Sequence, residues 1–250
     1  YPLPVFGHIP LVLGPDREKL SKRHGDVALQ AYRDRGYLPE AMVNYLVRLG
    51  WSHGDQEVFT REELVKAFQI ERVGVAPGIF DRSKLDWLNA LYLRQTPPER
   101  LGDLLTPFWG QAGVDRQAVE ARGRAWLAQA IPPFVERSKT LLELARSMAF
   151  LFAPPRERDP KAVATFLTVE HRVLLEEACR VLANIPDFSA EALEQAIRRL
   201  AEARGKKLVE VAQPIRVALT GTTISPPLFP VLALLGREVV LERLAQVLDR

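Results

Sequence analysis

The pattern of apolar and polar positions predicts helices along most of this chain. Between Pro39 and Gly50, apolar residues recur at the i, i+3, i+4, i+7 spacing that places them on one helix face. Pro39 suits the first turn of that helix, and Gly50 ends it. The apolar positions are Met42, Tyr45, Leu46 and Leu49.

Capping signals mark the starts of further helices in the first hundred residues. Asp26 is predicted to cap a helix that runs to Arg35. Thr60 and Glu63 stand at the spacing of a capping box, directly ahead of an apolar run. Asp81 is predicted to cap another helix. These signals indicate a compact helical unit in the first part of the chain.

From residue 71 onward the pattern changes. Residues 71–79 are β-branched and punctuated by glycine, which is typical of a short extended linker, and no convincing strand is predicted from Pro97 onward. Helices are predicted over residues 101–105, 114–131, 133–152, 162–183 and 190–204, from Pro214 towards Thr220, from Pro226, and over residues 238–248. The polar, proline-rich residues 153–160 form a connector. The fold class is therefore predicted to be mainly α, with two helical subdomains joined near residue 155.

Composition narrows the class of protein. The 250 residues are 47% hydrophobic, yet no run approaches the roughly 20 apolar residues of a membrane span. The first thirteen residues lack the charged start and cleavage site of a signal peptide, so a soluble, cytoplasmic chain without a membrane partner is expected. The single Cys179 excludes an internal disulfide framework. A net charge of +3 permits an RNA partner without demonstrating one.

A basic loop is the clearest candidate site. The apolar run of residues 5–13 predicts a buried strand, and Gly14-Pro15-Asp16 signals a turn. The following Ser21-Lys22-Arg23-His24-Gly25 combines backbone amides, a hydroxyl and two fixed cations. Charge-assisted contacts to phosphate are worth about 1.5–3 kcal/mol each, so the loop favours phosphate binding. The alternative is a solvated surface loop.

The sequence indicates neither a metal site nor a second phosphate-binding loop. The histidines are scattered, without the spacing of a zinc site, and no metal ligands are evident. No glycine-rich phosphate loop is found elsewhere in the chain. The four histidines are His8, His24, His53 and His171.

Residues 4–25, which include Pro4-Val5-Phe6-Gly7-His8-Ile9-Pro10 and the basic loop, resemble the end of the catalytic domain of bacterial glutamyl-tRNA synthetases, a class I family. The resemblance implies that Lys22 contacts the phosphates of ATP and that Ser21 and Lys19 support the loop. Arg23 stands where many class I enzymes have serine, and it would also face ATP. ATP would be a substrate, accompanied by Mg²⁺.

Two further segments carry the same resemblance. Tyr32-Arg33-Asp34-Arg35-Gly36-Tyr37-Leu38-Pro39 resembles the family's stem-contact module, and Gly205-Lys206-Lys207-Leu208-Val209-Glu210 resembles its helical anticodon-binding region. The implied organisation is the end of a catalytic domain over residues 1–25 and a stem-contact module over 26–96. Two anticodon-binding subdomains would follow, over residues 97–155 and 156–250.

The resemblance also implies that glutamate tRNA is the partner. Glu136-Arg137-Ser138-Lys139-Thr140-Leu141 resembles the family's helix at the anticodon, which makes Arg137 the candidate for base reading. A solvated arginine on a helix face, or a merely soluble basic surface, is the alternative for each cation. The candidates for backbone contacts are Arg33, Arg35, Arg198, Arg199, Arg204, Lys206 and Lys207.

The function implied is that of the C-terminal part of a glutamate–tRNA ligase, which attaches glutamate to tRNA through a glutamyl-adenylate. Only 18 residues precede Lys19, so a separate N-terminal catalytic portion is expected to complete the nucleotide site. The chain alone is expected to be inactive, and its parent to be a monomer. The alternative is a non-catalytic tRNA-binding module from a truncated or split synthetase.

Overall fold

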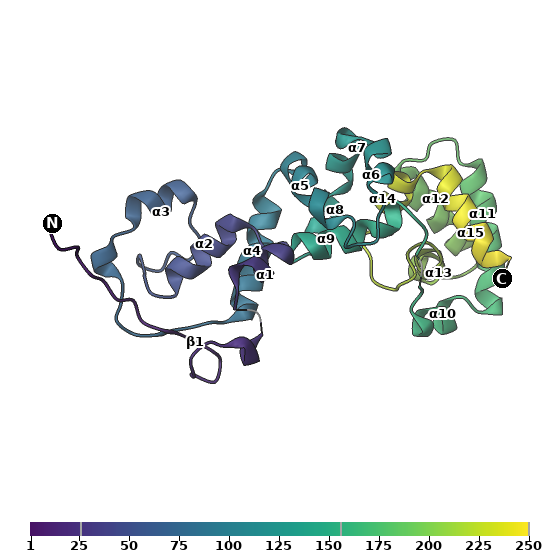
Figure 1. Cartoon of the computed structure of the whole chain (residues 1–250). Coiled ribbons are helices and arrows are strands. Elements are labelled where there is room, and N and C mark those ends of the chain that lie inside the picture. Colours follow the sequence, from purple (N-terminus) through teal and green to yellow (C-terminus); the bar gives the residue numbers. More distant parts are fainter. Residues whose placement is uncertain (26, 156, 250) are drawn as a thin grey trace. The chain divides into compact units, whose positions relative to one another are not determined.

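The computed structural model describes residues 1–25, 27–155 and 157–249, most of which are helical (Figure 1). The α-helices are α1 (Leu29–Asp34), α2 (Pro39–Arg48), α3 (Arg61–Ala67), α4 (Arg82–Gln95), α5 (Pro98–Leu105), α6 (Arg116–Arg122), α7 (Arg124–Ala130), α8 (Pro132–Val135), α9 (Leu141–Met148), α10 (Pro160–Phe166), α11 (Val169–Asn184), α12 (Ala190–Ala203), α13 (Leu208–Thr220), α14 (Leu228–Leu235) and α15 (Arg237–Leu248). Short 3₁₀ helices are η1 (Lys22–His24), η2 (Ile70–Arg72), η3 (Thr106–Phe108) and η4 (Ala149–Leu151). The strands are β1 (Val12–Leu13) and β2 (Gly78–Ile79). The predicted mainly α fold is confirmed.

The chain divides into two compact units. Unit 1 consists of Tyr1–Phe108 together with Val135–Leu144, and unit 2 consists of Trp109–Phe134 together with the described chain from Ala145 onward. A stretch of 10 residues thus returns to the first unit after the chain has entered the second. The division of the sequence into four functional segments stays a prediction.

In unit 1 a two-stranded parallel sheet joins the start of the chain to the linker before α4. Val12 pairs with Gly78 and Leu13 with Ile79, and the amide of Phe80 donates to the carbonyl of Leu13 at 2.8 Å. The linker prediction for residues 71–79 is therefore correct in part, because η2 and β2 interrupt it. The buried strand predicted over residues 5–13 is wrong in extent: β1 covers only Val12–Leu13, and residues 1–11 are almost all exposed.

One hydrophobic cluster of unit 1 lies between α1, α2 and α4, and the last two run side by side (Figure 1). Its buried side chains are Tyr32, Tyr37, Met42, Tyr45, Leu85 and Leu88. Asn44 is fully buried beside them, where its side chain donates to the carbonyl of Glu57 at 2.9 Å and accepts from the amide of Phe59 at 2.7 Å. Such pairing is what makes a buried amide tolerable.

The local capping signals are confirmed where the structure describes them. Thr60 accepts from the amide of Glu63 at 3.1 Å while the Glu63 carboxylate accepts from the amide of Thr60 at 2.6 Å. Asp81 caps α4 and Ser189 caps α12 through their side chains. Pro39 occupies the first turn of α2. The predicted cap Asp26 lies outside the described residues, and its helix is α1, which ends at Asp34.

The described residues of unit 2 form helices and no strand. Helix α11 packs against α12, α13 and α15, and α12 packs against α14. The predicted helix start at Pro214 is wrong: α13 begins at Leu208 and carries Pro214 inside it. An internal proline removes one backbone hydrogen bond and costs about 3 kcal/mol. The buried side chains of Val211 and Ile215 offset that cost, because packing of an apolar face contributes most of a helix's stability.

Two long predicted helices are each divided. The helix expected over residues 114–131 is α6 and α7, which meet at Gly123 with a φ of 80°, a value that favours glycine. The helix expected over residues 162–183 is α10 and α11, and Leu167 and Thr168 separate them. No helix among the described residues is both long and apolar enough to cross a membrane.

Candidate functional site

The basic loop is carried by a small hairpin in unit 1. The amide of Gly14 donates to the carbonyl of Glu18 at 2.8 Å, and the amide of Leu20 donates to the carbonyl of Val12 at 3.0 Å. The chain then enters η1, whose first residue is Lys22. Because β1 is hydrogen-bonded to β2, the hairpin presents the loop from a defined edge of unit 1.

His24 connects the two ends of this loop. Its Nδ1 accepts from the amide of Ser21 at 3.1 Å, and its Nε2 lies 2.9 Å from a carboxylate oxygen of Asp16. The hydrogen bond from His24 lowers the pKa of Asp16 below its usual value. The sequence suggests loop packing or a phosphate hydrogen bond for His24 and only a turn for Asp16, and the structure shows the ring packed within the loop. A Ser-x-x-His spacing, which mimics a capping box, is the signal that points to this contact.

The cations of the loop differ in their surroundings. The side chains of Lys19 and Lys22 are exposed, and neither has an ion-pair or hydrogen-bond partner among the described residues. Arg23 is engaged, since its Nη2 lies 3.1 Å from Asp16. Lys22 is therefore available to an incoming anion, whereas Arg23 would first have to leave Asp16.

The helix expected over residues 133–152 is divided into α8, α9 and η4, and Arg137 lies in the exposed turn between α8 and α9. The turn is anchored within unit 1: the amide of Leu141 donates to the carbonyl of Gly36 at 2.9 Å. Gly36 has a φ of 84°, and a Cβ there would come within 2.8 Å of the Leu141 amide nitrogen. Only glycine suits this close approach. The turn is thus held by the backbone at Gly36.

The basic cluster at residues 198–207 belongs to unit 2, and acidic neighbours neutralise part of it. Arg198 lies 2.7 Å from Glu194, Lys206 lies 3.8 Å from Glu210, and Arg204 pairs with Glu177. Among the cluster's cations, Arg199 and Lys207 have no side-chain partner within the described part of the chain. These two are the more available candidates for phosphate contacts.

The two cations predicted to contact tRNA at the end of α1, Arg33 and Arg35, are also exposed. Arg33 lies 3.0 Å from its neighbour Asp34, an exposed pair of the kind that contributes little to stability. Arg35 follows at the end of α1. Arg33, Arg35 and Arg137 are all in unit 1, so the predicted tRNA contacts are distributed over both units.

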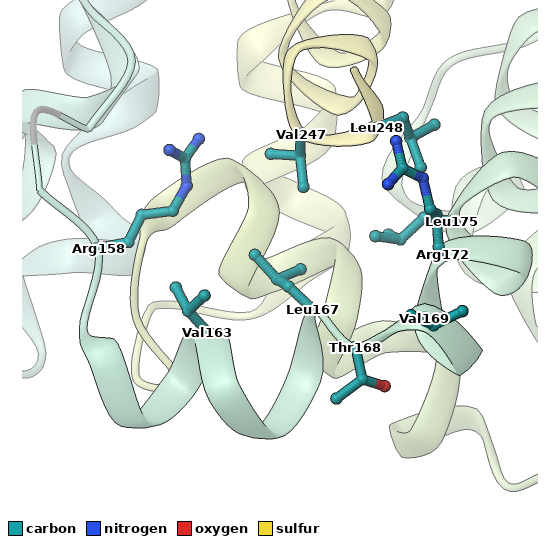
Figure 2. A pocket seen from close by; sticks show the side chains of 9 residues that line it. All are labelled: Arg158, Val163, Leu167, Thr168, Val169, Arg172, Leu175, Val247 and Leu248. Atoms are coloured by element: carbon teal, nitrogen blue, oxygen red, sulfur yellow. The ribbon is translucent and has the colours of Figure 1, made fainter. Parts of the chain in front are cut away.

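Unit 2 also contains a hollow of about 370 Å³ (Figure 2). Figure 2 shows Arg158 and Arg172 on opposite sides of it, with Val247 between them. Leu167, Val169 and Leu175 contribute to its apolar walls. An apolar group with an adjacent anion would match this lining, and no pattern in the sequence predicts the hollow.

The described residues do not form a ready-made set of metal ligands. Among the described residues, no group of three or more His, Cys, Asp or Glu side chains is placed to hold a metal ion. At the basic loop the carboxylate of Asp16 is already occupied by His24 and Arg23. The loop residues therefore do not fit a Mg²⁺ site of their own.

Comparison with known proteins gives two family matches. Residues 100–248 match the anticodon binding domain, and residues 1–87 match the catalytic domain of class I tRNA synthetases (E and Q). The glutamate–tRNA ligase of Syntrophobacter fumaroxidans is 47% identical over 246 residues, which are 98% of this chain and 52% of that protein. The ligase of Nitratidesulfovibrio vulgaris is 48% identical over 246 residues, again 52% of its length.

Solved structures agree with the fold. A glutamate tRNA ligase from Elizabethkingia meningosepticum, crystallised in complex with its amino acid, superposes with a TM-score of 0.84 at 27% identity and matches 99% of this chain and 52% of its own. Glutamate-tRNA synthetase from Elizabethkingia anophelis gives a TM-score of 0.81 at 26% identity. The chain spans about half the length of the curated relatives it matches. It belongs to the glutamate–tRNA ligase family, of which it represents the end of the class I catalytic domain and the anticodon-binding domain.

Proposed function

We propose that this chain is the tRNA-binding part of a glutamate–tRNA ligase and that its basic loop supplies a contact to ATP. In the complete reaction, a carboxylate oxygen of glutamate attacks the α-phosphorus of ATP and pyrophosphate leaves. The terminal ribose hydroxyl of the tRNA then attacks the adenylate carbonyl, and AMP leaves. The observation that carries the ATP proposal is an exposed Lys22 on an anchored loop, within the segment that matches the catalytic domain.

Lys22 would act on the charge that develops on the leaving pyrophosphate. A fixed cation lowers the barrier when it interacts more strongly with the transition state than with bound ATP. Ser21 and Lys19 would support the loop, and Arg23 would contact ATP only after exchanging Asp16 for phosphate. Mg²⁺, when bound together with ATP, would neutralise phosphate charge. The rest of the nucleotide site would come from the N-terminal catalytic portion.

Recognition of glutamate tRNA would combine base reading with backbone contacts. Arg137 is exposed on a turn held by the backbone, which suits a planar guanidinium that reads an unstacked base. Arg199 and Lys207 are the first candidates for phosphate contacts in unit 2. The engaged cations would contribute once tRNA displaces their acidic neighbours; they are Arg198, Arg204 and Lys206, with Arg33 in unit 1. Arg35 completes the proposed set. The proposed setting is a cytoplasmic, monomeric parent enzyme.

The decisive experiment compares the chain alone with the chain plus its N-terminal portion. The chain alone should bind glutamate tRNA but give no glutamate-dependent ATP–pyrophosphate exchange, because a catalytic group accelerates the reaction only where the reactants are positioned beside it. Exchange should appear in the full-length ligase that contains this sequence. Exchange by the chain alone, above a no-enzyme control, would overturn the proposed division of labour.

A second candidate function is a non-catalytic tRNA-binding module. It is favoured by the match of residues 100–248 to the anticodon binding domain, which is a binding domain and not a catalytic one. The two functions differ in one result. A module that works without catalysis would gain no exchange activity when the N-terminal portion of the ligase is added.

A further inference from the structure

We propose that His24 is a positioning residue that locks the basic loop as the neutral Nε2–H tautomer. In this lock, His24 accepts a hydrogen bond from the backbone of Ser21 and donates one to Asp16, and so fixes the direction in which Lys22 leaves the chain. The relevance of the lock to ATP rests on the proposed function of Lys22. The lock itself rests only on contacts within the loop.

The hydrogen-bond partners determine the tautomer. A backbone amide can only donate, so the Ser21 amide, 3.1 Å away, requires Nδ1 to be without a proton. An ionised carboxylate can only accept, so Asp16, 2.9 Å away, requires Nε2 to carry one. Arg23 Nε lies 3.2 Å from Nε2, but a protonated Nε2 has no lone pair to offer it. Arg23 instead pairs with Asp16 through Nη2.

The ring is also held by packing. The His24 side chain is 9% exposed and lies over Gly14. A Cβ at Gly14 would come within 2.9 Å of the ring atoms Cδ2 and Nε2, which is closer than real side chains approach. The three heavy atoms nearest to that Cβ all belong to the His24 ring. The absence of a side chain at Gly14 is therefore what leaves room for the ring.

The lock fixes the backbone of Lys22, which lies between Ser21 and His24. Ser21 precedes Lys22, His24 follows it by two residues, and the amide of His24 donates to the carbonyl of Ser21 at 2.9 Å. The amide of Gly25 donates to the carbonyl of Lys22 at 3.1 Å. A backbone held in this way has already lost much of its conformational entropy. The entropic cost of ordering the loop when Lys22 binds a phosphate is therefore smaller.

The first test is spectroscopic and uses the chain as it exists. Long-range ¹H–¹⁵N correlation spectra at neutral pH distinguish the two imidazole tautomers, and His24 can be assigned by comparison with His24→Asn. We expect Nε2 of His24 to be protonated and Nδ1 to be unprotonated. An Nδ1–H tautomer, or a mixture of both tautomers, would overturn the lock.

The second test is a double-mutant cycle on the ring and the glycine beneath it. Trypsin cleavage after Lys22 and Arg23 reports how often the loop opens, and we expect Gly14→Ala and His24→Ala each to accelerate cleavage about tenfold. In the His24→Ala background, Gly14→Ala should add nothing, because the ring that it displaces is gone. Gly7→Ala, which has open space around its Cβ, is the matched control. If the two substitutions accelerate cleavage independently, so that their factors multiply in the double variant, the lock is contradicted.

A conservative variant separates the two hydrogen bonds of the lock. The side-chain oxygen of His24→Asn lies as many bonds from the backbone as Nδ1 and can accept from Ser21, so this variant should restore part of the protection that His24→Ala loses. In the full-length ligase, His24→Ala should then lower the adenylation rate more than His24→Asn does. Equal losses in both variants would refute positioning through Ser21. A lock confirmed by both loop tests, with an unchanged rate for Lys22→Ala, would refute only the proposed ATP contact.

Discussion

The side-chain amide of Asn89 donates to the backbone carbonyl of Lys139 at 2.5 Å, across 50 residues of sequence. The same side chain accepts from the amide of Leu38 at 2.8 Å and is fully buried. Asn89 thereby ties α4 to the start of α2 and to the turn that carries Arg137. This contact explains how a short return segment stays with unit 1.

Asn89→Ala should therefore destabilise unit 1. The substitution leaves the buried amide of Leu38 without its partner, and an unsatisfied buried group costs about 1–3 kcal/mol. Urea unfolding of the chain measures the loss. Asn184→Ala is the matched control, because the exposed Asn184 bonds only to Arg180 within its own helix. Equal stability of the two variants would contradict the role of Asn89.

Arg137→Ala and Lys207→Ala should affect tRNA binding differently. Loss of a base-reading arginine should reduce discrimination among anticodons, whereas loss of a phosphate-binding lysine should weaken all tRNAs alike. Removing one phosphate contact should also flatten the log–log salt dependence by roughly 0.7 to 0.9. Titrations against stem-loops with matched and altered anticodons provide the measurement. Arg137 is not a base reader if its removal weakens every stem-loop by the same factor.

Lys207 is preferred over Lys206 for this comparison. Lys206 lies 3.8 Å from Glu210, so its removal also takes a neutralising charge from a carboxylate that repels RNA. Arg199, whose side chain has no partner among the described residues, offers a second test of the same surface, and Arg199→Gln should resemble Lys207→Ala in its salt dependence.

Lys22→Ala in the full-length ligase should lower the rate of glutamate activation with little change in tRNA affinity. Removing one group that stabilises transition-state charge costs on the order of 2.7–4 kcal/mol, which corresponds to about 100- to 1000-fold in rate. Single-turnover adenylate formation measures the step directly. Lys66→Ala, an exposed lysine on α3, serves as the control. An unchanged rate for Lys22→Ala would remove Lys22 from the ATP site.

Tyr45 should make the stability of unit 1 fall in alkaline solution. Burial raises the pKa of Tyr45 to about 12, and its hydroxyl donates to the carbonyl of Asp81 at 2.8 Å. An unfolded tyrosine has a pKa of about 10, so between about pH 10 and 12 the unfolded state releases a proton that the folded state retains. The free energy of unfolding therefore decreases as the pH rises through this window.

Tyr45→Phe removes that dependence. Its unfolding free energy should fall less steeply above pH 10, while at neutral pH it should lose about 1 kcal/mol with the hydrogen bond. Tyr37, whose pKa burial also raises, should preserve part of the slope. Tyr1→Phe is the control because Tyr1 is fully exposed. A slope unaffected by Tyr45→Phe would show that other groups control alkaline unfolding.

The helix starts could be predicted where they depend on neighbouring residues alone. Thr60 with Glu63, Asp81 and Ser189 cap their helices as expected, because a cap joins groups two or three residues apart. Long-range packing overturned the expectations for α13. There the burial of Val211 and Ile215 outweighs the cost of Pro214.

For the site, the sequence by itself determined the family resemblance and the identity of the basic loop, because a motif is a local order of residues. Only the tertiary structure decided which cations remain available: Asp16 engages Arg23, and Glu177 engages Arg204 from a different helix. It also placed Arg137 on a turn anchored to Asn89 through Lys139. These features depend on groups brought together by folding, and no periodicity along the chain reports such distances.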